Sequence, residues 1–320
     1  MSIKPIILLG SGNSGSGAVK GYLCNRGDLF DPLGGAEFRL IQEKGGLSSL
    51  HASMTTEFHP EKASYAVFEF IELAKRLGNS SKKLSIPPKV GYGFATRIPN
   101  YESAIACFIN DITDCSFGIT TLTDLLDLGT LDWIRYMTGR TPKFSRYLKP
   151  FPVTKEVFLE RTRELFRHLF FENPADPKDK LGYVFDQAGS FWSPTSSTKY
   201  FGKHRKVIVV SRDPRDIYTQ QFKLYRGGVS EFVKYYNSIM AHITSEELFS
   251  PCVLHIEFNS FVLDYDNEYI RLCDFLNIPH EITSKYDPKL STKNVGVYKK
   301  FLTPEESDFI SNNCVKVGKR

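Results

Sequence analysis

A segment rich in glycine and serine near the start of the chain has the residue types that bind phosphate. Residues 10–17 read Gly-Ser-Gly-Asn-Ser-Gly-Ser-Gly, between the apolar run Pro5–Leu9 and the helix-like segment Ala18–Leu23. This order predicts a buried strand, a tight turn and a helix. Small residues let backbone N–H groups converge on an anion, and the helix dipole adds partial positive charge there. The segment therefore predicts a phosphate-binding loop, although an ordinary strand-to-helix turn is the alternative.

The end of this loop differs from the loop of nucleotide hydrolases. Their pattern requires Lys and then Ser or Thr after the glycines, whereas Gly15 is followed here by Ser16 and Gly17. The lysine that would contact a γ-phosphate is therefore missing. A P-loop kinase is disfavoured for this reason, and also because no clear acidic magnesium ligand follows a later strand.

A second stretch places basic side chains where a strand is expected to end. Residues 206–210 are mostly β-branched, and Ser-Arg-Asp-Pro-Arg-Asp follows at 211–216. Ligands of open α/β sheets bind at the carboxyl ends of strands, which makes Arg212 a candidate anion ligand. Pro214 suits the first turn of a helix and Asp216 suits its N-terminus, so a capped helix start with solvated arginines is the alternative.

Together, the two stretches resemble the sulfotransferases that use 3′-phosphoadenosine 5′-phosphosulfate (PAPS). Residues 253–258 and 269–279 look like the late strand and following helix of that family, and residues 291–300 look like its C-terminal nucleotide-contacting loop. These segments cover the N-terminal fifth and the last third of the chain. The resemblance implies an α/β, three-layer, P-loop-type fold with a central, mainly parallel sheet.

The resemblance also implies where the donor binds. The first loop would hold the 5′-phosphosulfate, Arg212 would contact the 3′-phosphate, and the C-terminal loop would close over the nucleotide. PAPS would be the donor, and 3′-phosphoadenosine 5′-phosphate (PAP) would be the product. The donor-binding residues implied in this way are Ser11, Gly12, Asn13, Ser14, Gly15, Ser16, Gly17, Arg212, Gln220, Lys293, Asn294, Val295 and Gly296.

Sulfuryl transfer needs a base for the acceptor proton, and the glycan-modifying branch of the family suggests two carboxylates. Glu37 is the first candidate, because residues 35–41 match a strand after the first helix; pairing with Arg39 or a lysine is its other possible role. Asp186 is the second candidate, and capping a turn is its alternative. Arg39 and Gln187 are expected to contact the acceptor, and no metal is required.

Three residues depart from the family pattern. Asn13 stands where Lys or Arg is usual, Gln187 replaces another lysine, and Gln220 replaces a serine that helps to hold the 3′-phosphate. Loss of one preorganised donor can cost about 10²–10³ in rate, so a weak or inactive nucleotide-binding homologue is an alternative. The cations that could compensate are Lys20, Arg39, Lys199 and Arg215.

The composition is that of an ordinary globular chain. It has 320 residues, of which 41% are hydrophobic and 24% charged, and we expect one sulfotransferase-like domain over residues 1–320. Residues from about 60 to 180 are predicted to form an inserted helical substrate or lid region. Six scattered cysteines without a Cys-x-x-Cys pair indicate neither a disulfide framework nor a zinc site.

The N-terminal sequence lacks a signal-peptide core, and its apolar run is too short to span a bilayer. We therefore expect a cytoplasmic protein without stable membrane insertion. The net charge of +5 permits nucleic-acid binding, but no recognition motif is present, and nucleic acid is not the expected partner.

The expected acceptor is a hydroxyl of a carbohydrate or glycoconjugate. Residues 135–167 carry more basic than acidic side chains, with aromatic residues interleaved. This pattern could form a lid that attracts an acidic acceptor, although a solvated helix face with i,i+3 ion pairs is the alternative.

Overall fold

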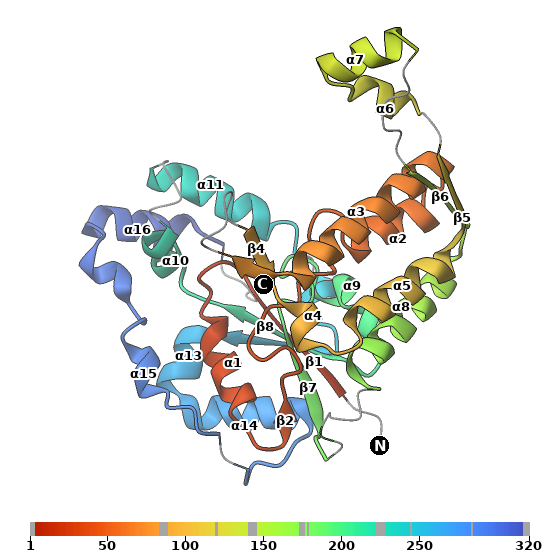
Figure 1. Ribbon diagram of the computed structural model, residues 1–320. Helices are drawn as coiled ribbons and strands as arrows, with labels where there is room; N and C mark the ends of the chain where they lie inside the picture. The colour runs from red at the N-terminus through yellow and green to blue at the C-terminus, as the bar shows by residue number, and fades with distance from the viewer. Residues whose placement is uncertain are drawn as a thin grey trace. The chain divides into compact units, whose positions relative to one another are not determined.

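The structure is a computed structural model that describes residues 4–82, 89–118, 121–139, 146–172, 177, 179–221, 228–243, 245–282 and 284–315 (Figure 1). Two compact units are present. The sheet unit comprises Met1–Ile41 and Pro174–Arg320, and the helical unit comprises Gln42–Asn173. Both ends of the sequence therefore contribute to the sheet unit.

The sheet unit is built on parallel strands. Among the described residues the sheet has five strands in the order β2-β7-β1-β8-β9, and every neighbouring pair is parallel. The strands in this order are Leu29–Phe30, Gly182–Asp186, Lys4–Gly10, Lys206–Ser211 and Val253–Glu257. Strands β7, β1 and β8 consist almost entirely of buried residues, as expected for a parallel sheet covered on both faces.

One face of the sheet is covered by three helices. These are α1 (Ser16–Cys24), α13 (Phe258–Leu263) and α14 (Tyr265–Leu276). Their apolar side chains form one buried cluster with alternate strand residues, because successive side chains of a strand point to opposite faces. The strand residues in the cluster are Ile6, Leu8, Leu29, Val184, Ile208, Val210 and Ile256.

The opposite face packs against α9 (Pro194–Ser197) and the short 3₁₀ helix η1 (Lys199–Phe201). The ring centroids of Phe185 and Phe201 lie 4.9 Å apart. Because helical elements cover both faces, the α/β fold class with a central parallel sheet, which the sequence predicted, is confirmed.

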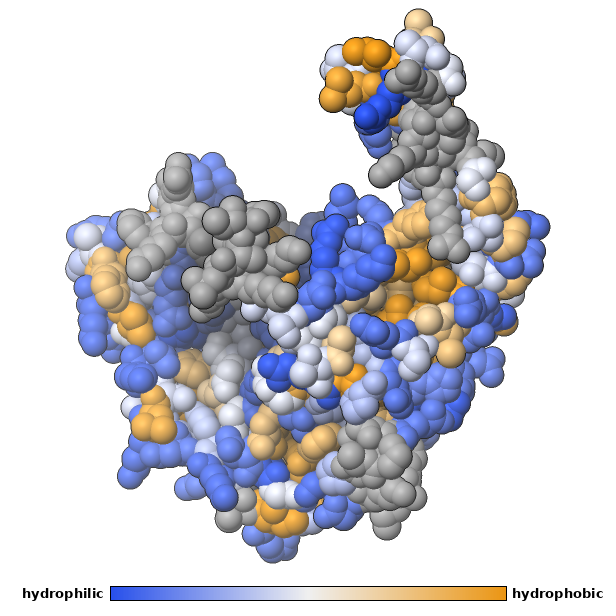
Figure 2. Space-filling view, viewed as in Figure 1, coloured by the Kyte–Doolittle hydropathy of each residue, from blue (hydrophilic) through white to orange (hydrophobic). Residues whose placement is uncertain are grey.

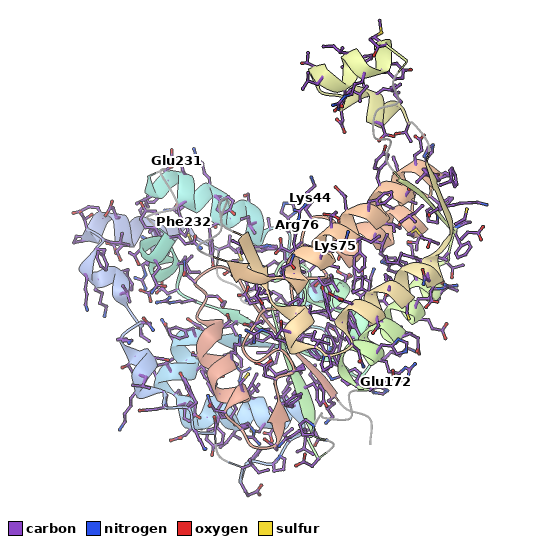
Figure 3. The ribbon with its side chains drawn as sticks, in the orientation of Figure 1. Lys44, Lys75, Arg76, Glu172, Glu231 and Phe232 are labelled. Atoms are coloured by element: carbon purple, nitrogen blue, oxygen red, sulfur yellow. The ribbon has the colours of Figure 1, made fainter. Side chains whose placement is uncertain are left out.

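The remaining helices of the sheet unit follow β8 and β9. They are α10 (Pro214–Gln221), α11 (Val229–Met240), α12 (Ser245–Leu248), α15 (Lys289–Thr292), η2 (Val297–Lys300) and α16 (Pro304–Asn313). Phe232 in the first turn of α11 packs against Tyr218 of α10, with ring centroids 5.0 Å apart (Figure 3). This contact holds α11 beside the helix that begins just after Arg212.

The helical unit has an aromatic core. The rings of Phe70 and Phe108 lie 5.6 Å apart, those of Phe108 and Phe158 lie 6.1 Å apart, and His51 stacks on Phe158. These contacts join four helices of the unit. The elements of the unit are α2 (Leu47–Thr55), α3 (Pro60–Gly78), β3 (Ser80–Lys82), β4 (Lys89–Tyr92), α4 (Phe94–Arg97), α5 (Tyr101–Ile112), β5 (Thr113–Gly118), α6 (Leu122–Leu126), α7 (Thr130–Met137), β6 (Arg146–Pro150) and α8 (Lys155–Phe170).

The segment around Glu37 differs from the sequence expectation. Residues 35–41 were predicted to form a strand, but Glu37 makes only an isolated parallel bridge with Asp186. Gly34 and Gly35 have φ values of 54° and 89°, so the chain turns there and does not extend. In the basic stretch 135–167, residues 140–145 lie outside the described residues.

Gly15 is a position in the glycine-rich segment that is sensitive to substitution. It has φ of 84°, and an added Cβ would lie 2.3 Å from the Phe258 ring. We expect Gly15→Ala to lower the free energy of unfolding by about 3 kcal/mol, since backbone strain and overpacking add. Urea unfolding measures the effect. Gly17→Ala is the control, because a Cβ there meets no atom within 4 Å; equal losses in the two variants would contradict the packing argument.

Candidate functional site

The glycine-rich segment connects the end of β1 to the start of α1, as predicted. Asn13 and Gly15 both have positive φ, at 61° and 84°, and they turn the chain between Gly10 and Ser16. Gly15 is the N-cap of α1 and provides no side-chain acceptor. The first backbone N–H groups of a helix have no partner within the helix, so this end of α1 can bind an anion.

Ser14 lies at the centre of the loop. Its backbone N donates to Ser11 O at 3.0 Å, and its side chain is buried. Within the described part of the chain, Ser14 Oγ has no hydrogen-bond partner. A Cβ added to Gly10 would lie 2.2 Å from this oxygen, so the space beside it exists only because residue 10 is glycine. An unpaired buried hydroxyl costs about 1–3 kcal/mol, and a phosphate or sulfate oxygen would satisfy it.

Arg212 joins three segments that are far apart in the sequence. Its Nη1 donates to Asn13 O at 3.1 Å and to Gln220 Oε1 at 2.8 Å, and its Nη2 donates to Asn294 O. The side chain is only 2% exposed. The structure thus brings together the loop, α10 and the C-terminal segment, as the predicted donor site requires.

The remaining nitrogen of Arg212 is less well satisfied. Considering only residues that the structure describes, its buried Nε has no hydrogen bond. It lies 3.7 Å from Asp216 Oδ2, and the guanidinium lies over the Phe258 ring at 5.0 Å. Burial lowers the pKa of Arg212, and Asp216 and Asp213 oppose the shift. Arginine stays charged in proteins, so this site places a fixed positive charge beside the loop.

Asp216 positions the C-terminal segment. Its carboxylate is fully buried and accepts hydrogen bonds from Gly296 N and Tyr298 N, both at 3.0 Å. Sequence reasoning assigned Asp216 only to the start of a helix. No local pattern indicates its second role, because Asp216 and Gly296 are 80 positions apart in the sequence.

Asp186 has a buried carboxylate with one paired and one unpaired oxygen. Its Oδ2 lies 2.7 Å from Lys20 Nζ, whereas Oδ1 is buried without a hydrogen-bond partner among the residues described. Burial raises the pKa of Asp186, the Lys20 ammonium lowers it, and the charges of Glu37 and Asp31 raise it further. A carboxylate whose pKa is raised by burial and that keeps one oxygen unpaired is a candidate proton acceptor.

Glu37 lies beside Asp186 in a different environment. The two residues form a parallel bridge, and Phe38 N donates to Asp186 O at 2.7 Å. The Glu37 carboxylate forms an ion pair with Arg39 at 2.7 Å, and the two side chains are 34% and 28% exposed. The pairing of Glu37 with Arg39, left open by the sequence, is therefore present.

The other predicted residues lie around this arrangement. Gln187 has φ of 54° and accepts a long hydrogen bond, 3.5 Å, from Gly10 N. In the C-terminal segment, Lys293 is exposed, Val295 packs against the apolar cluster of the sheet, and Gly296 is held by Asp216. Gln187 thus contacts the beginning of the glycine-rich segment.

The structure separates the cations that could compensate for Asn13 and Gln187. Lys20 also donates to Gly35 O at 2.7 Å and so lies at the carboxylates. Arg215 forms a 2.6 Å ion pair with Asp213 and stacks over the Tyr298 ring at 4.0 Å. Lys199 lies over the Tyr200 ring. Lys20 therefore contacts the candidate base Asp186, as Arg39 contacts the other candidate, Glu37.

Sequence reasoning missed two polar side chains near the site. Gln221 Nε2 donates to Gly12 O at 3.0 Å, which links α10 to the loop a second time. His255 Nε2 lies 2.7 Å from Ser211 Oγ, directly before Arg212. Burial, with a smaller effect of Arg271, lowers the pKa of His255 to about 4, so the imidazole is neutral near pH 7. A histidine within a strand gives no signal of such a pairing.

In the described ranges, no three His, Cys, Asp or Glu side chains lie close enough together to hold a metal ion. None of the helices found there is both long and apolar enough to cross a membrane.

Asp216 provides a test of how the site is held together. Asp216→Asn replaces one acceptor by a donor that faces a backbone N–H and removes the counter-charge of Arg212. We expect the free energy of unfolding to fall by about 3 kcal/mol, and the Gly296 and Tyr298 amides to exchange hydrogen faster. Urea unfolding and hydrogen exchange measure these effects.

Asp213→Asn is the matched control for this substitution. Asp213 accepts from Arg215 N at the start of α10, and asparagine caps a helix about as well as aspartate. We expect a loss below about 1 kcal/mol, because the Asp213–Arg215 ion pair is partly exposed. Equal losses at positions 213 and 216 would show that Asp216 does not clamp the C-terminal segment.

Comparison with known proteins gave matches among solved structures alone: no family model and no curated protein matches the chain. A sulfotransferase domain from the Synechococcus PCC 7002 olefin synthase is similar at 10% identity, over 97% of this chain and 94% of that one, with a TM-score of 0.44. A sulfotransferase domain from the curacin biosynthetic pathway has 13% identity, coverage of 98% and 97%, and a TM-score of 0.43. A retinol dehydratase in complex with androsterone and the inactive cofactor PAP has 10% identity, coverage of 100% and 84%, and a TM-score of 0.35. Sulfotransferases are therefore among the solved structures to which this chain is similar.

Proposed function

We propose that the protein transfers a sulfuryl group from PAPS to a hydroxyl of a carbohydrate or glycoconjugate. The observation that carries the proposal is the position of Arg212. It joins the glycine-rich loop, Gln220 and the C-terminal segment, which are the segments that the sequence motifs assign to one nucleotide. These segments are separated by about 80 to 200 residues, and one buried cation links them.

Two groups of residues in the candidate site are suited to bind an anionic donor. The unpaired Ser14 hydroxyl and the N-terminus of α1 offer hydrogen-bond donors to a 5′-phosphosulfate. Arg212, Gln220 and the segment that starts at Lys293 would hold the 3′-phosphate. Both Nη groups of Arg212 already donate to protein oxygens, so a phosphate oxygen would replace at least one of these acceptors. When bound, PAPS supplies the activated sulfuryl group.

Asp186 is the base in this proposal. It is more deeply buried than Glu37, its pKa is raised by burial, and one of its oxygens is unpaired, whereas Glu37 is paired with Arg39. Asp186 accepts the proton of the acceptor hydroxyl as the oxygen bonds to sulfur. The bond between sulfur and the phosphate oxygen breaks, and PAP leaves with that oxygen. Lys20, which contacts Asp186, supplies positive charge that Asn13 and Gln187 do not.

The carbohydrate acceptor is supported by aromatic side chains beside the loop. Phe191 and Trp192 pack edge to face, 4.8 Å apart. Trp192 lines a cavity of about 80 Å³ together with Ser11 and Gly12. Flat aromatic faces are suited to pack against sugar rings, so an acceptor sugar next to Trp192 would lie close to the donor loop.

Nucleotide binding by the intact protein tests the proposed donor site. We expect PAP to bind in a calorimetric titration, and Arg212→Ala to weaken PAP by at least about tenfold, as loss of a charged hydrogen bond does. Adenosine 5′-phosphosulfate, which lacks the 3′-phosphate, should be weakened much less. Arg212→Lys keeps the positive charge and is the control for a general loss of folding. Arg167→Ala is a second control, because it removes an exposed arginine of the helical unit.

Two results would contradict this assignment. A dissociation constant for PAP weaker than about 1 mM in the unmodified protein would exclude the donor site. Equal weakening of both nucleotides by Arg212→Ala would show that this arginine does not contact the 3′-phosphate.

Sulfate transfer by variants of the two candidate carboxylates tests the assignment of Asp186 as the base. We expect Asp186→Asn to reduce transfer of radiolabelled sulfate to a panel of glycans by about 10²-fold or more, the usual effect of losing a general base. Glu37→Gln is the matched control and should reduce transfer by less than about tenfold. PAP binding by both variants shows that the donor site is retained.

Transfer that survives Asp186→Asn would exclude Asp186 as the base. If the unmodified protein binds PAP but transfers sulfate to no acceptor of the panel, the nucleotide-binding homologue without activity becomes the better assignment, with the neutral side chains of Asn13 and Gln187 as its physical basis.

A further inference from the structure

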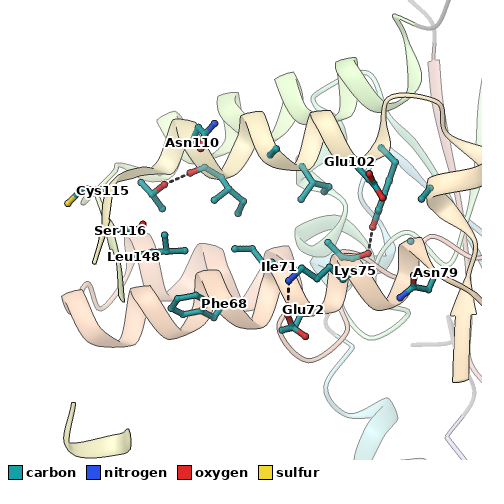
Figure 4. A pocket seen from close by; sticks show the side chains of 18 of the residues that line it. Phe68, Ile71, Glu72, Lys75, Asn79, Glu102, Asn110, Cys115, Ser116 and Leu148 are labelled. Carbon is teal, nitrogen blue, oxygen red and sulfur yellow. Dashed lines mark hydrogen bonds and ion pairs between the residues drawn. The ribbon is translucent and has the colours of Figure 1, made fainter. Parts of the chain in front are cut away.

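Two cavities of the protein differ in the segments that line them. The helical unit has a groove of about 1130 Å³ between α3 and α5 (Figure 4), and Figure 2 shows apolar surface there. All of its described lining residues belong to the helical unit. The cavity of about 80 Å³ is instead lined by Ser11 and Gly12 of the glycine-rich segment, by Trp192 and by aromatic side chains of α11. The smaller cavity is therefore adjacent to the proposed donor site.

Trp192 lies in the turn that leads from the candidate base to α9. The turn begins at Gln187, whose backbone N donates to Leu8 O of β1 at 2.8 Å. At the other end, Ser190 N donates to Ser197 Oγ of α9 at 2.8 Å, and Trp192 N donates to Ser190 Oγ at 3.2 Å. The position of Trp192 at the cavity therefore depends on where α9 is held.

Helix α9 begins without a cap from its own N-cap residue. The backbone angles of Ser193, φ −146° and ψ 62°, lie outside the extended region usual for a cap, and within the part of the chain that the structure describes its side chain makes no capping hydrogen bond. Pro194 has no N–H. Thr195 and Ser196 thus carry the first backbone N–H groups of α9, which have no partner within the helix.

Glu247 of α12 accepts hydrogen bonds from both of these N–H groups. Its Oε2 accepts from Thr195 N, and its two carboxylate oxygens accept from Ser196 N at 3.2 and 3.3 Å. Oε1 also accepts from the Ser196 hydroxyl, and the Thr195 hydroxyl donates to Glu247 O at 3.0 Å. Hydrogen bonds from a helix N-terminus to a carboxylate are among the stronger ones in proteins. A residue 52 positions further along the chain therefore takes the place of the cap.

A cation contacts the carbonyl groups of the same short helix. Arg205 Nη2 donates to Thr195 O at 2.8 Å, and its Nε donates to Thr198 Oγ1 at 2.9 Å. The side chain of Thr198 is fully buried. These bonds fix the end of α9 that is distant from Trp192, so Glu247 is left to hold the end that is next to it.

We propose that Glu247 is a positioning residue for the acceptor: by holding the first turn of α9, it fixes Trp192 at the cavity beside the glycine-rich segment. The inference rests on the proposed function, which places the acceptor next to Trp192. Loss of the carboxylate would leave two backbone N–H groups without their acceptor, so the first turn of α9 would shift and Trp192 would move with it. A displacement of about 1 Å at a reacting site can cost about 10²-fold in rate.

The position of Trp192 can be measured without sulfuryl transfer. The chain has two tryptophans, so Trp133→Phe leaves Trp192 as the sole source of tryptophan fluorescence. In this background we expect Glu247→Ala to shift the emission to longer wavelength and to increase its quenching by acrylamide, because Trp192 becomes more exposed to water. Glu247→Gln keeps one acceptor oxygen and should produce smaller changes of the same kind.

Steady-state kinetics with an acceptor from the glycan panel gives a second measurement. We expect Glu247→Ala to raise the acceptor KM by at least about tenfold, with a smaller change in kcat and an unchanged dissociation constant for PAP. A partial loss of folded protein would instead lower kcat at constant KM. The two explanations therefore predict different results.

Glu246→Ala is the matched control. Glu246 is exposed on the same short helix, so this substitution removes the same charge while the hydrogen bonds of Glu247 to α9 remain. The emission of Trp192 and the acceptor KM should both stay as in the unmodified protein. Circular dichroism shows whether each variant is folded.

The positioning role is overturned if Glu247→Ala leaves either the emission of Trp192 or the acceptor KM unchanged, or if Glu246→Ala alters both as much. In that case PAP binding and sulfate transfer by the unmodified protein still support the proposed function. An unmodified protein that binds no PAP overturns the proposed function, and the acceptor role of Glu247 with it, whatever the fluorescence shows.

Discussion

The burial of one arginine constrains the arrangement of the sheet unit. A guanidinium removed from water is costly unless hydrogen bonds and opposite charge replace its hydration. Arg212 obtains them from Asn13, Gln220, Asn294 and Asp216. The strand order that sets β1 beside β8 makes this possible, because it places the loop after β1 next to the residue that ends β8. The site is thus held by a charge that the fold must satisfy.

The sequence predicted the local elements of this site but not the contacts between them. The apolar runs before Gly10 and Ser211 indicated buried strands, and the small residues and Pro214 indicated the helix starts that follow; these are properties of a few neighbouring residues. The ion pair of Lys20 with Asp186 and the bonds of Asp216 to Gly296 and Tyr298 join residues 80 or more positions apart. Their pairing depends on strand order and register, which no local pattern contains. The strand predicted around Glu37 is absent, because Gly34 and Gly35 adopt positive φ values that turn the chain.

Backbone conformation also bears on the two neutral residues that stand where cations were expected. Asn13 and Gln187 both have positive φ. Asparagine is among the residues that adopt this conformation most readily, whereas a long side chain does so at some cost. The requirement for a turn at position 13 therefore gives a physical reason for asparagine there. Positive charge enters the site instead from Lys20, one turn into α1, where side-chain length does not conflict with the turn.

The hydrogen bonds of Asp216 to the C-terminal segment affect which residues that segment can contain. Asp216 contacts the backbone N–H groups of residues 296 and 298 and not their side chains. Many side chains at the adjacent positions are compatible with the same two hydrogen bonds, provided that residue 296 can adopt its positive φ. Through evolution or design, the C-terminal segment can therefore exchange the groups that it presents to a ligand while its attachment to the fold stays the same.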